Sequence, residues 1–197
     1  LDYTDCEPPK LTVTSDKLNN TKLSKGMVLS RYDLINLALV SSDNIAAVTL
    51  AQNYPGGMSY FVTMMNQNSK DLGLMNTGFV EPTGLSPMNY STLHDISILT
   101  KIVGTYDIIR NAAKTTLLTV TAYKNKKTIT IKAPATTIFF GKENIIAVKT
   151  GFTKAAGFCI TMLVDNGNRL YNIVILGSKT KQERNKLVTN TLAQLSL

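Results

Sequence analysis

Apolar residues recur every three or four positions in the first part of the chain and alternate with polar residues in the second part. The first spacing is typical of amphipathic helices, and the alternation is typical of strands with one buried face. Helices are predicted over residues 30–41, 45–51, 59–72, 92–103 and 106–113. Strands are predicted over residues 11–13, 116–123, 128–132, 145–150, 158–164 and 170–176, followed by a last helix over 181–195. Helices first and strands later indicate an α+β fold.

Several boundaries of these elements are marked by capping and turn residues. Ser30 is followed three residues later by Asp33, as in a capping box at a helix start. The run Ser41–Asn44 favours side-chain hydrogen bonds over helix, so the first helix is expected to end there. Lys124–Lys127 is predicted as a hairpin tip, and Asn166-Gly167 as a two-residue turn between two strands.

The composition limits the class of protein. The 197 residues are 44% hydrophobic and 17% charged, which excludes a disordered chain. No apolar run approaches the roughly 20 residues that span a bilayer. The net charge of +8 favours anionic surroundings, but the aromatic–basic pattern of an RNA-binding sheet is missing, so no nucleic-acid partner is expected. One histidine and two distant cysteines, Cys6 and Cys159, are too few for a zinc site; their pairing stays open.

Two tripeptides carry the candidate chemistry. Ser42-Asp43-Asn44 lies between two predicted helices, and Lys149-Thr150-Gly151 lies at the end of a predicted strand. Each tripeptide alone is a weak signal, because such short patterns occur by chance. In this order and in these structural settings, they match the second and third signatures of the penicillin-recognising serine enzymes.

Six further segments resemble stretches of D-alanyl-D-alanine carboxypeptidases, in the same order along the chain. They are residues 11–17, 25–28, 72–79 (LGLMNTGF), 81–85 (EPTGL), 90–95 (YSTLHD) and 149–159 (KTGFTKAAGFC). The chain therefore resembles the low-molecular-mass penicillin-binding proteins, within the β-lactamase-like superfamily of serine peptidases, over essentially its whole length.

The resemblance implies both a fold and a reaction. The fold is the β-lactamase/DD-peptidase-like transpeptidase fold, with a helical lobe and an antiparallel sheet flanked by helices. Residues 1–17 and 114–197 are expected to form the α/β lobe, and residues 18–113 the helical lobe with the SDN motif. The implied reaction is hydrolysis of peptidoglycan stem peptides ending in D-Ala-D-Ala through an acyl-enzyme. β-Lactams are implied ligands, the implied location is extracytoplasmic, and no cofactor is expected.

The same resemblance assigns roles to residues of the two tripeptides. Ser42 relays a proton to the leaving amine, Asn44 binds the substrate amide, and Lys149 supplies positive charge beside them. The substrate-binding residues are Thr150, Gly151 and Thr153. The two threonine hydroxyls meet the terminal carboxylate, and the glycine lets the peptide approach the strand by β-augmentation.

The chain departs from the family pattern in three ways. The nucleophile of this family lies in an S-x-x-K motif ahead of the SxN tripeptide, and no such motif stands there. Because the chain begins with Leu1 instead of Met, we interpret it as a piece of a longer protein, inactive alone and associating with its N-terminal segment or another copy. Ala135-Thr136-Thr137 replaces an Asn-rich element, and Glu81 replaces an asparagine.

Two other functions remain open on the sequence. One is a catalytically inactive relative that binds peptidoglycan or completes another chain. The other is a class A-like β-lactamase, in which Glu81 positions the water that deacylates the enzyme. His94, the single histidine, is expected to have a structural role at a helix start rather than to act as a base.

Overall fold

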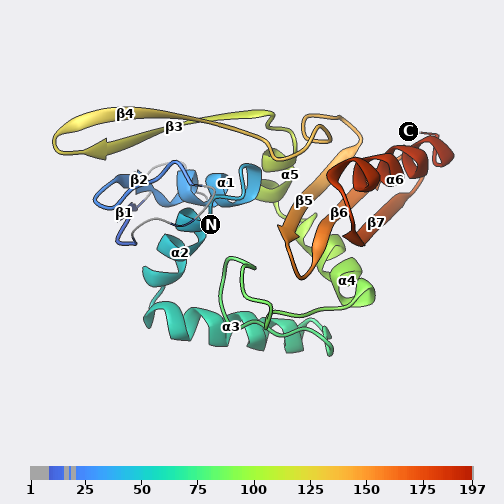
Figure 1. Ribbon diagram of the computed structural model, residues 1–197, viewed down its shortest axis with the longest axis horizontal. Helices are drawn as coiled ribbons and strands as arrows, with labels where there is room; N and C mark the ends of the chain where they lie inside the picture. Colours follow the sequence, from blue (N-terminus) through green and yellow to red (C-terminus); the bar gives the residue numbers. More distant parts are fainter. Residues whose placement is uncertain (1–8, 16–17, 19–20, 197) are drawn as a thin grey trace.

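The computed structural model describes residues 9–15, 18 and 21–196 of the chain (Figure 1). The helices are α1 (Arg31–Val40), α2 (Asn44–Gln52), α3 (Gly57–Asp71), α4 (Leu93–Val103), α5 (Asp107–Ala113) and α6 (Lys181–Gln194). The strands are β1 (Lys10–Thr12), β2 (Val28–Ser30), β3 (Leu117–Lys124), β4 (Lys127–Pro134), β5 (Ile145–Thr153), β6 (Gly157–Asp165) and β7 (Leu170–Ser178). The predicted α+β class is confirmed, and every predicted helix and strand is present.

The strands form two antiparallel sheets. One has the order β1-β2-β3-β4, and the other has the order β5-β6-β7. The long β3–β4 hairpin therefore joins β2, through the pair Val28–Tyr123, and extends away from the three-stranded sheet (Figure 1). The division into an α/β lobe and a helical lobe stays a prediction. No helix in the described part of the chain is both long and apolar enough to cross a membrane.

Helix α1 begins at the cap predicted at Ser30, and α4 has a similar cap. The Ser30 side chain accepts a hydrogen bond from the backbone N–H of Asp33, and Thr92 does the same for Asp95 at the start of α4. Each cap satisfies one of the N–H groups that a first helical turn leaves unpaired.

The turn between β6 and β7 lies one residue later than predicted. The backbone N–H of Asn166 donates to the carbonyl of Arg169 (3.2 Å), so Gly167 and Asn168 are its central residues. Gly167 alone has a positive φ (84°), which suits glycine at the first central position of a hairpin turn. The Asn166 side chain accepts from the N–H groups of Asn168 and Arg169, which explains why this asparagine precedes the turn.

Helix α1 connects two hydrophobic cores. Leu34 and Leu37 pack under the four-stranded sheet, whereas Val40 packs in the core of the three-stranded sheet with Val148 and Val188. Helices α4 and α6 both contact β6 and β7, and Figure 1 shows them on opposite faces of that sheet. The C-terminal end of α1 is thus anchored beside β5, and this end leads directly into the SDN tripeptide.

Candidate active site

The junction between α1 and α2 holds Ser42 in an unusual conformation. The backbone N–H groups of Ser41 and Asp43 both donate to the carbonyl of Leu37 (3.2 and 3.1 Å). Between them, Ser42 has a φ of 53°, in the left-handed region that a non-glycine residue rarely adopts. This sharp reversal directs the chain from one helix into the next, and Ser42 lines a surface hollow there.

Asp43 fixes this junction and is a positioning residue that the sequence indicated only as part of a turn. Its buried carboxylate accepts from the backbone N–H of Ala46 (3.0 Å), which caps α2. It also accepts from the Thr21 hydroxyl (2.9 Å) and the Lys22 N–H (3.1 Å). Because these donors come from two segments, the carboxylate ties the start of α2 to the chain that precedes β2.

Lys149 reaches the junction from β5. The Lys149 Nζ donates to the Ser42 hydroxyl, which lies 107 residues earlier in the sequence, and to the carbonyl of Thr150 (3.0 Å). Burial lowers the pKa of Lys149 to about 8, because the charged ammonium loses hydration there. The two tripeptides therefore meet through a lysine that exchanges protons readily near neutral pH.

The outer edge of β5 faces the hollow. The sheet order makes β5 a terminal strand, and none of the described strands pairs with this edge. The Thr150 hydroxyl donates to the Thr136 hydroxyl (2.7 Å), and Gly151 has open space where a side chain would project. The backbone of β5 is thus accessible to an extended peptide, the geometry that β-augmentation needs.

The hollow has a volume of about 560 Å³ and a basic lining. Five of the six predicted site residues line it: Ser42, Asn44, Lys149, Thr150 and Gly151. The other lining residues are Thr83, Gly84, Leu85, Thr136, Phe152, Phe158, Lys181 and Arg184. Among these described residues three are cationic and none is acidic, so the hollow suits an anionic group of a ligand.

Arg184 is a lining residue that the sequence analysis did not select. It lies in the first turns of α6 and is almost fully buried, with 3% of its surface exposed. Its guanidinium donates to the Asn185 side chain (2.8 Å) and to the carbonyl of Cys159 (3.5 Å). Burial lowers the pKa of Arg184, and the nearby Cys159 opposes this effect. The helical pattern predicted α6, but a pattern of spacing does not reveal that an arginine faces inward.

Thr153, the sixth predicted site residue, is placed elsewhere. It is the last residue of β5, and its hydroxyl accepts from the backbone N–H of Ala156 (3.0 Å). This contact stabilises the turn between β5 and β6, and Thr153 does not line the hollow. Cys159 lies in β6 and forms no disulfide with any described residue; Cys6 lies outside the described residues, so their pairing stays open.

Thr136 occupies the position where the sequence departs from the Asn-rich element of the family. Its backbone N–H donates to the carbonyl of Val40 (3.1 Å), at the end of α1. With the hydroxyl contact to Thr150, this places Thr136 between the two tripeptides. The departure therefore leaves a polar side chain on this wall of the hollow.

Glu81 does not line the hollow, although its loop does. Its carboxylate accepts from groups of its own loop, and partial burial, which raises its pKa, is outweighed by the hydrogen bonds from Thr83, Ser86 and Gly84, which lower it. A carboxylate whose oxygens accept from its own loop and that does not line the hollow is not placed to activate a water there, as the β-lactamase alternative requires.

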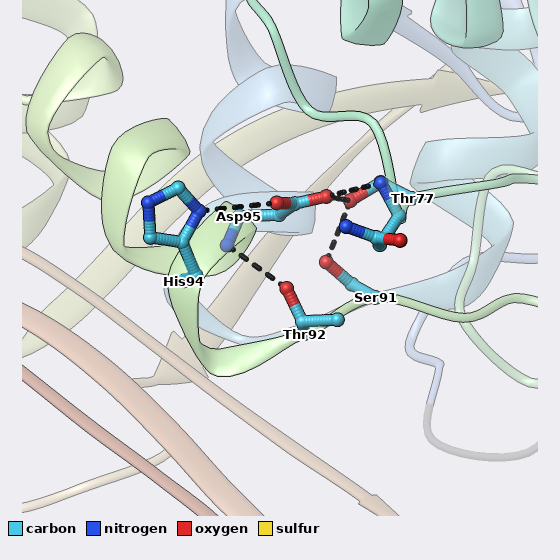
Figure 2. Close-up of polar contacts among 6 residues, drawn as sticks. Thr77, Ser91, Thr92, His94 and Asp95 are labelled. Atoms are coloured by element: carbon cyan, nitrogen blue, oxygen red, sulfur yellow. Dashed lines mark hydrogen bonds and ion pairs between the residues drawn. The ribbon is translucent and has the colours of Figure 1, made fainter.

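His94 is an exposed residue at the start of α4, with 80% of its side chain accessible. Figure 2 shows its ring on the opposite side of Asp95 from Thr77. The buried Asp95 carboxylate accepts from the Asn76 N–H and the Thr77 hydroxyl (both 2.8 Å). His94 takes no part in the hollow, whereas Asp95 anchors the start of the loop that reaches it.

Comparison with known proteins places the chain in a family. The fold and the contact between the two tripeptides define the class of penicillin-recognising serine peptidases. The family described as D-alanyl-D-alanine carboxypeptidase (peptidase family S11) matches residues 6–180, and the chain belongs to this family. The resemblance inferred from the sequence is thereby confirmed.

Three relatives illustrate the extent of the similarity. A D-alanyl-D-alanine endopeptidase of Pseudomonas aeruginosa is 38% identical over 165 residues, covering 79% of this chain and 50% of the relative. A single-site mutant of the Streptomyces K15 DD-transpeptidase has the same fold, with a TM-score of 0.84, 22% identity and coverage of 98% and 81%. Penicillin-binding protein D2 of Listeria monocytogenes gives a TM-score of 0.77, 26% identity and coverage of 95% and 75%. The chain spans about half the length of the curated relatives it matches.

Proposed function

We propose that the protein carrying this chain is a serine-type D-alanyl-D-alanine peptidase that acts on peptidoglycan stem peptides outside the cytoplasm. The contact between Lys149 Nζ and the Ser42 hydroxyl carries this proposal, because it joins two distant motifs beside an open strand edge. Family membership supports the substrate class. Both carboxypeptidase and endopeptidase action fit, since the family description and the Pseudomonas relative name one each.

In this proposal the peptide lies along β5 as an added strand. Gly151 gives its backbone room to approach, and the Thr150 hydroxyl and the buried Arg184 guanidinium complement its terminal carboxylate. A Lys149 with a pKa of about 8 passes a proton through the Ser42 hydroxyl to the leaving amine. Asn44 binds the substrate amide at the start of α2. The acylated serine belongs to an S-x-x-K motif outside these 197 residues.

The role of Thr153 is the weakest part of the predicted site. Its hydroxyl accepts from Ala156, and it lies beyond the hollow, so we propose that it shapes the end of β5 rather than binding the carboxylate. The expected association of the chain with its N-terminal segment or another copy stays a prediction.

The test is the intact mass of the protein that carries this chain after exposure to excess ampicillin, the β-lactam bound in the structure of the Listeria relative. A stoichiometric adduct on a serine of an S-x-x-K motif supports the proposal, and this chain alone should show none. A folded natural protein that forms no adduct but binds a D-Ala-D-Ala peptide reversibly would support the inactive binding protein instead. Rapid release of the adduct, abolished by Glu81→Gln, would support the β-lactamase.

A further inference from the structure

The segment between α3 and α4 forms a closed loop that contributes one wall of the hollow. Gly78 and Tyr90 exchange backbone hydrogen bonds at its base (2.9 and 3.0 Å). The Asn66 side chain of α3 pairs with both the N–H and the carbonyl of Phe79 (2.8 Å each). At the other end of the loop, residues 83–85 line the hollow opposite the β5 edge. We call residues 83–85 the rim.

The rim makes few regular backbone contacts of its own. Gly84 has a φ of 79°, and the Leu85 N–H donates to the Thr83 hydroxyl (3.2 Å). Leu85 is 44% exposed, so burial in a core does not hold it in place. Its position must come from another group in the loop.

Glu81 is that group. One carboxylate oxygen accepts from the N–H and the hydroxyl of Thr83, and the other accepts from the Ser86 N–H (3.1 Å) and Asn89 Nδ2 (2.8 Å). An ionised carboxylate offers about four lone-pair sites, which these four donors fill, and the nearby Gly84 N–H adds to their stabilisation of the charge. Thr83 is the first residue of the rim, and Ser86 and Asn89 follow its last residue, so the carboxylate fixes both ends of the rim.

We propose that Glu81 is a positioning residue that holds the rim where the peptide substrate packs against it. This inference rests on the proposed function of the hollow. The glutamate acts through Thr83 and Leu85, not as a base, because its lone pairs are occupied and it does not line the hollow. An amide side chain here would have one acceptor oxygen, which leaves two of the four donors without a partner.

Glu81→Gln in the protein that carries this chain tests the inference. The substitution keeps the shape of the side chain but places an NH₂ group against N–H donors. We expect KM for a D-Ala-D-Ala peptide to rise about tenfold, with kcat within about threefold of the native value. The amides of Thr83 and Ser86 should exchange hydrogen at least about tenfold faster. Glu143→Gln, which neutralises an exposed carboxylate away from the hollow, is the matched control and should change none of these quantities.

A second variant separates positioning from a general loss of folding. Asn89→Asp combined with Glu81→Gln restores a donor–acceptor contact between the two side chains but loses the contact from Asn89 Nδ2 to the Glu81 carbonyl (3.1 Å), so KM should fall about threefold from the Glu81→Gln value without reaching the native value. Asn89→Asp alone places two carboxylates together and should impair the rim. Simple destabilisation would lower the active fraction, and thus apparent kcat, without this pattern in KM.

Two outcomes overturn the inference alone. One is an unchanged KM despite faster exchange of the rim amides, which would show that the substrate does not use the rim. The other is a kcat lowered about a hundredfold with an unchanged KM, which would make Glu81 a chemical participant. A folded native protein that turns over no D-Ala-D-Ala peptide would overturn the proposed function, and this inference with it.

Discussion

The floor of the hollow, formed by Ser42 and Lys149, and the loop between α3 and α4, which forms one wall, hold polar groups by opposite means. On the floor, burial lowers the pKa of Lys149 to about 8, and Ser42 is held at a φ of 53°. In and beside the loop, converging hydrogen-bond donors outweigh the opposing effect of burial and lower the pKa values of Glu81, within the loop, and of Asp95, in the first turn of α4. The floor thus destabilises the charged form of its ionisable group, whereas the loop stabilises the charged forms of its carboxylates.

This difference separates the chemistry from its support. A lysine whose charged form is destabilised by burial releases a proton readily. A serine in a strained backbone conformation keeps its hydroxyl in one direction. Both features lower stability where they occur. The loop, whose carboxylates accept several hydrogen bonds, adds local stability and keeps one wall of the hollow in place beside the strained floor.

The largest expected effect comes from Lys149→Met. Loss of the proton carrier should lower turnover of a D-Ala-D-Ala peptide about 10³-fold. Stability at pH 7 should rise by about 1–3 kcal/mol, because the substitution removes a charge whose pKa is about 8 in the fold against 10.5 outside it. Steady-state kinetics and urea unfolding measure the two effects.

The gain in stability from Lys149→Met should depend on pH. Below pH 8 Lys149 is charged in both states, and the full cost of burying the charge is present. Between pH 8 and 10.5 the folded protein has lost the proton that the unfolded chain keeps, so the advantage of the variant shrinks. Lys142→Met, at an exposed lysine, should show neither effect. Turnover within tenfold of native in Lys149→Met would contradict the role given to the floor.

The same contrast explains which features were predictable from the sequence. The cap at Ser30 uses local side-chain chemistry, and the alternation of apolar residues follows strand geometry, so both were predicted. The β3–β4 hairpin was predicted, but the pairing of β3 with β2 was not, because local patterns do not state which distant strands become neighbours.

The site shows the same limit. Ser42 and Lys149 were found through tripeptides whose order matches a family, and the structure brings them into contact. Arg184 was not selected, because inward orientation is a tertiary property. The substrate-binding role of Thr153 stays a prediction, and its hydroxyl accepts from a turn N–H that the motif did not indicate. The support given by Glu81 was also hidden, since four donors converge on it only in the folded loop.

As the pH falls, the loop should lose stability before the floor does. The pKa values of Glu81 and Asp95 are below their ordinary values of 4.5 and 3.8, so the stability they supply is complete above those values. It is lost as the pH falls through the lowered pKa values of the folded state. Urea unfolding between pH 7 and 3 should show this decline, and it should be shallower in the Glu81→Gln, Asp95→Asn double variant. If the free energy of unfolding declines equally with pH in the native protein and in the double variant, other groups cause the acid sensitivity.

The smallest effect expected is a difference between two substitutions of Ser42. Ser42→Ala and Ser42→Gly both remove the hydroxyl that accepts from Lys149, so turnover should fall equally in both. Only glycine adopts a φ of 53° without steric cost, so Ser42→Gly should be more stable than Ser42→Ala by about 1 kcal/mol in urea unfolding. The neighbouring Ser41 has a φ of −99°, and there the order should reverse, because alanine loses less chain entropy than glycine on folding. Equal stability of the two Ser42 variants would mean that the junction carries no backbone strain, and that only the buried charge of Lys149 sets the floor apart from the loop.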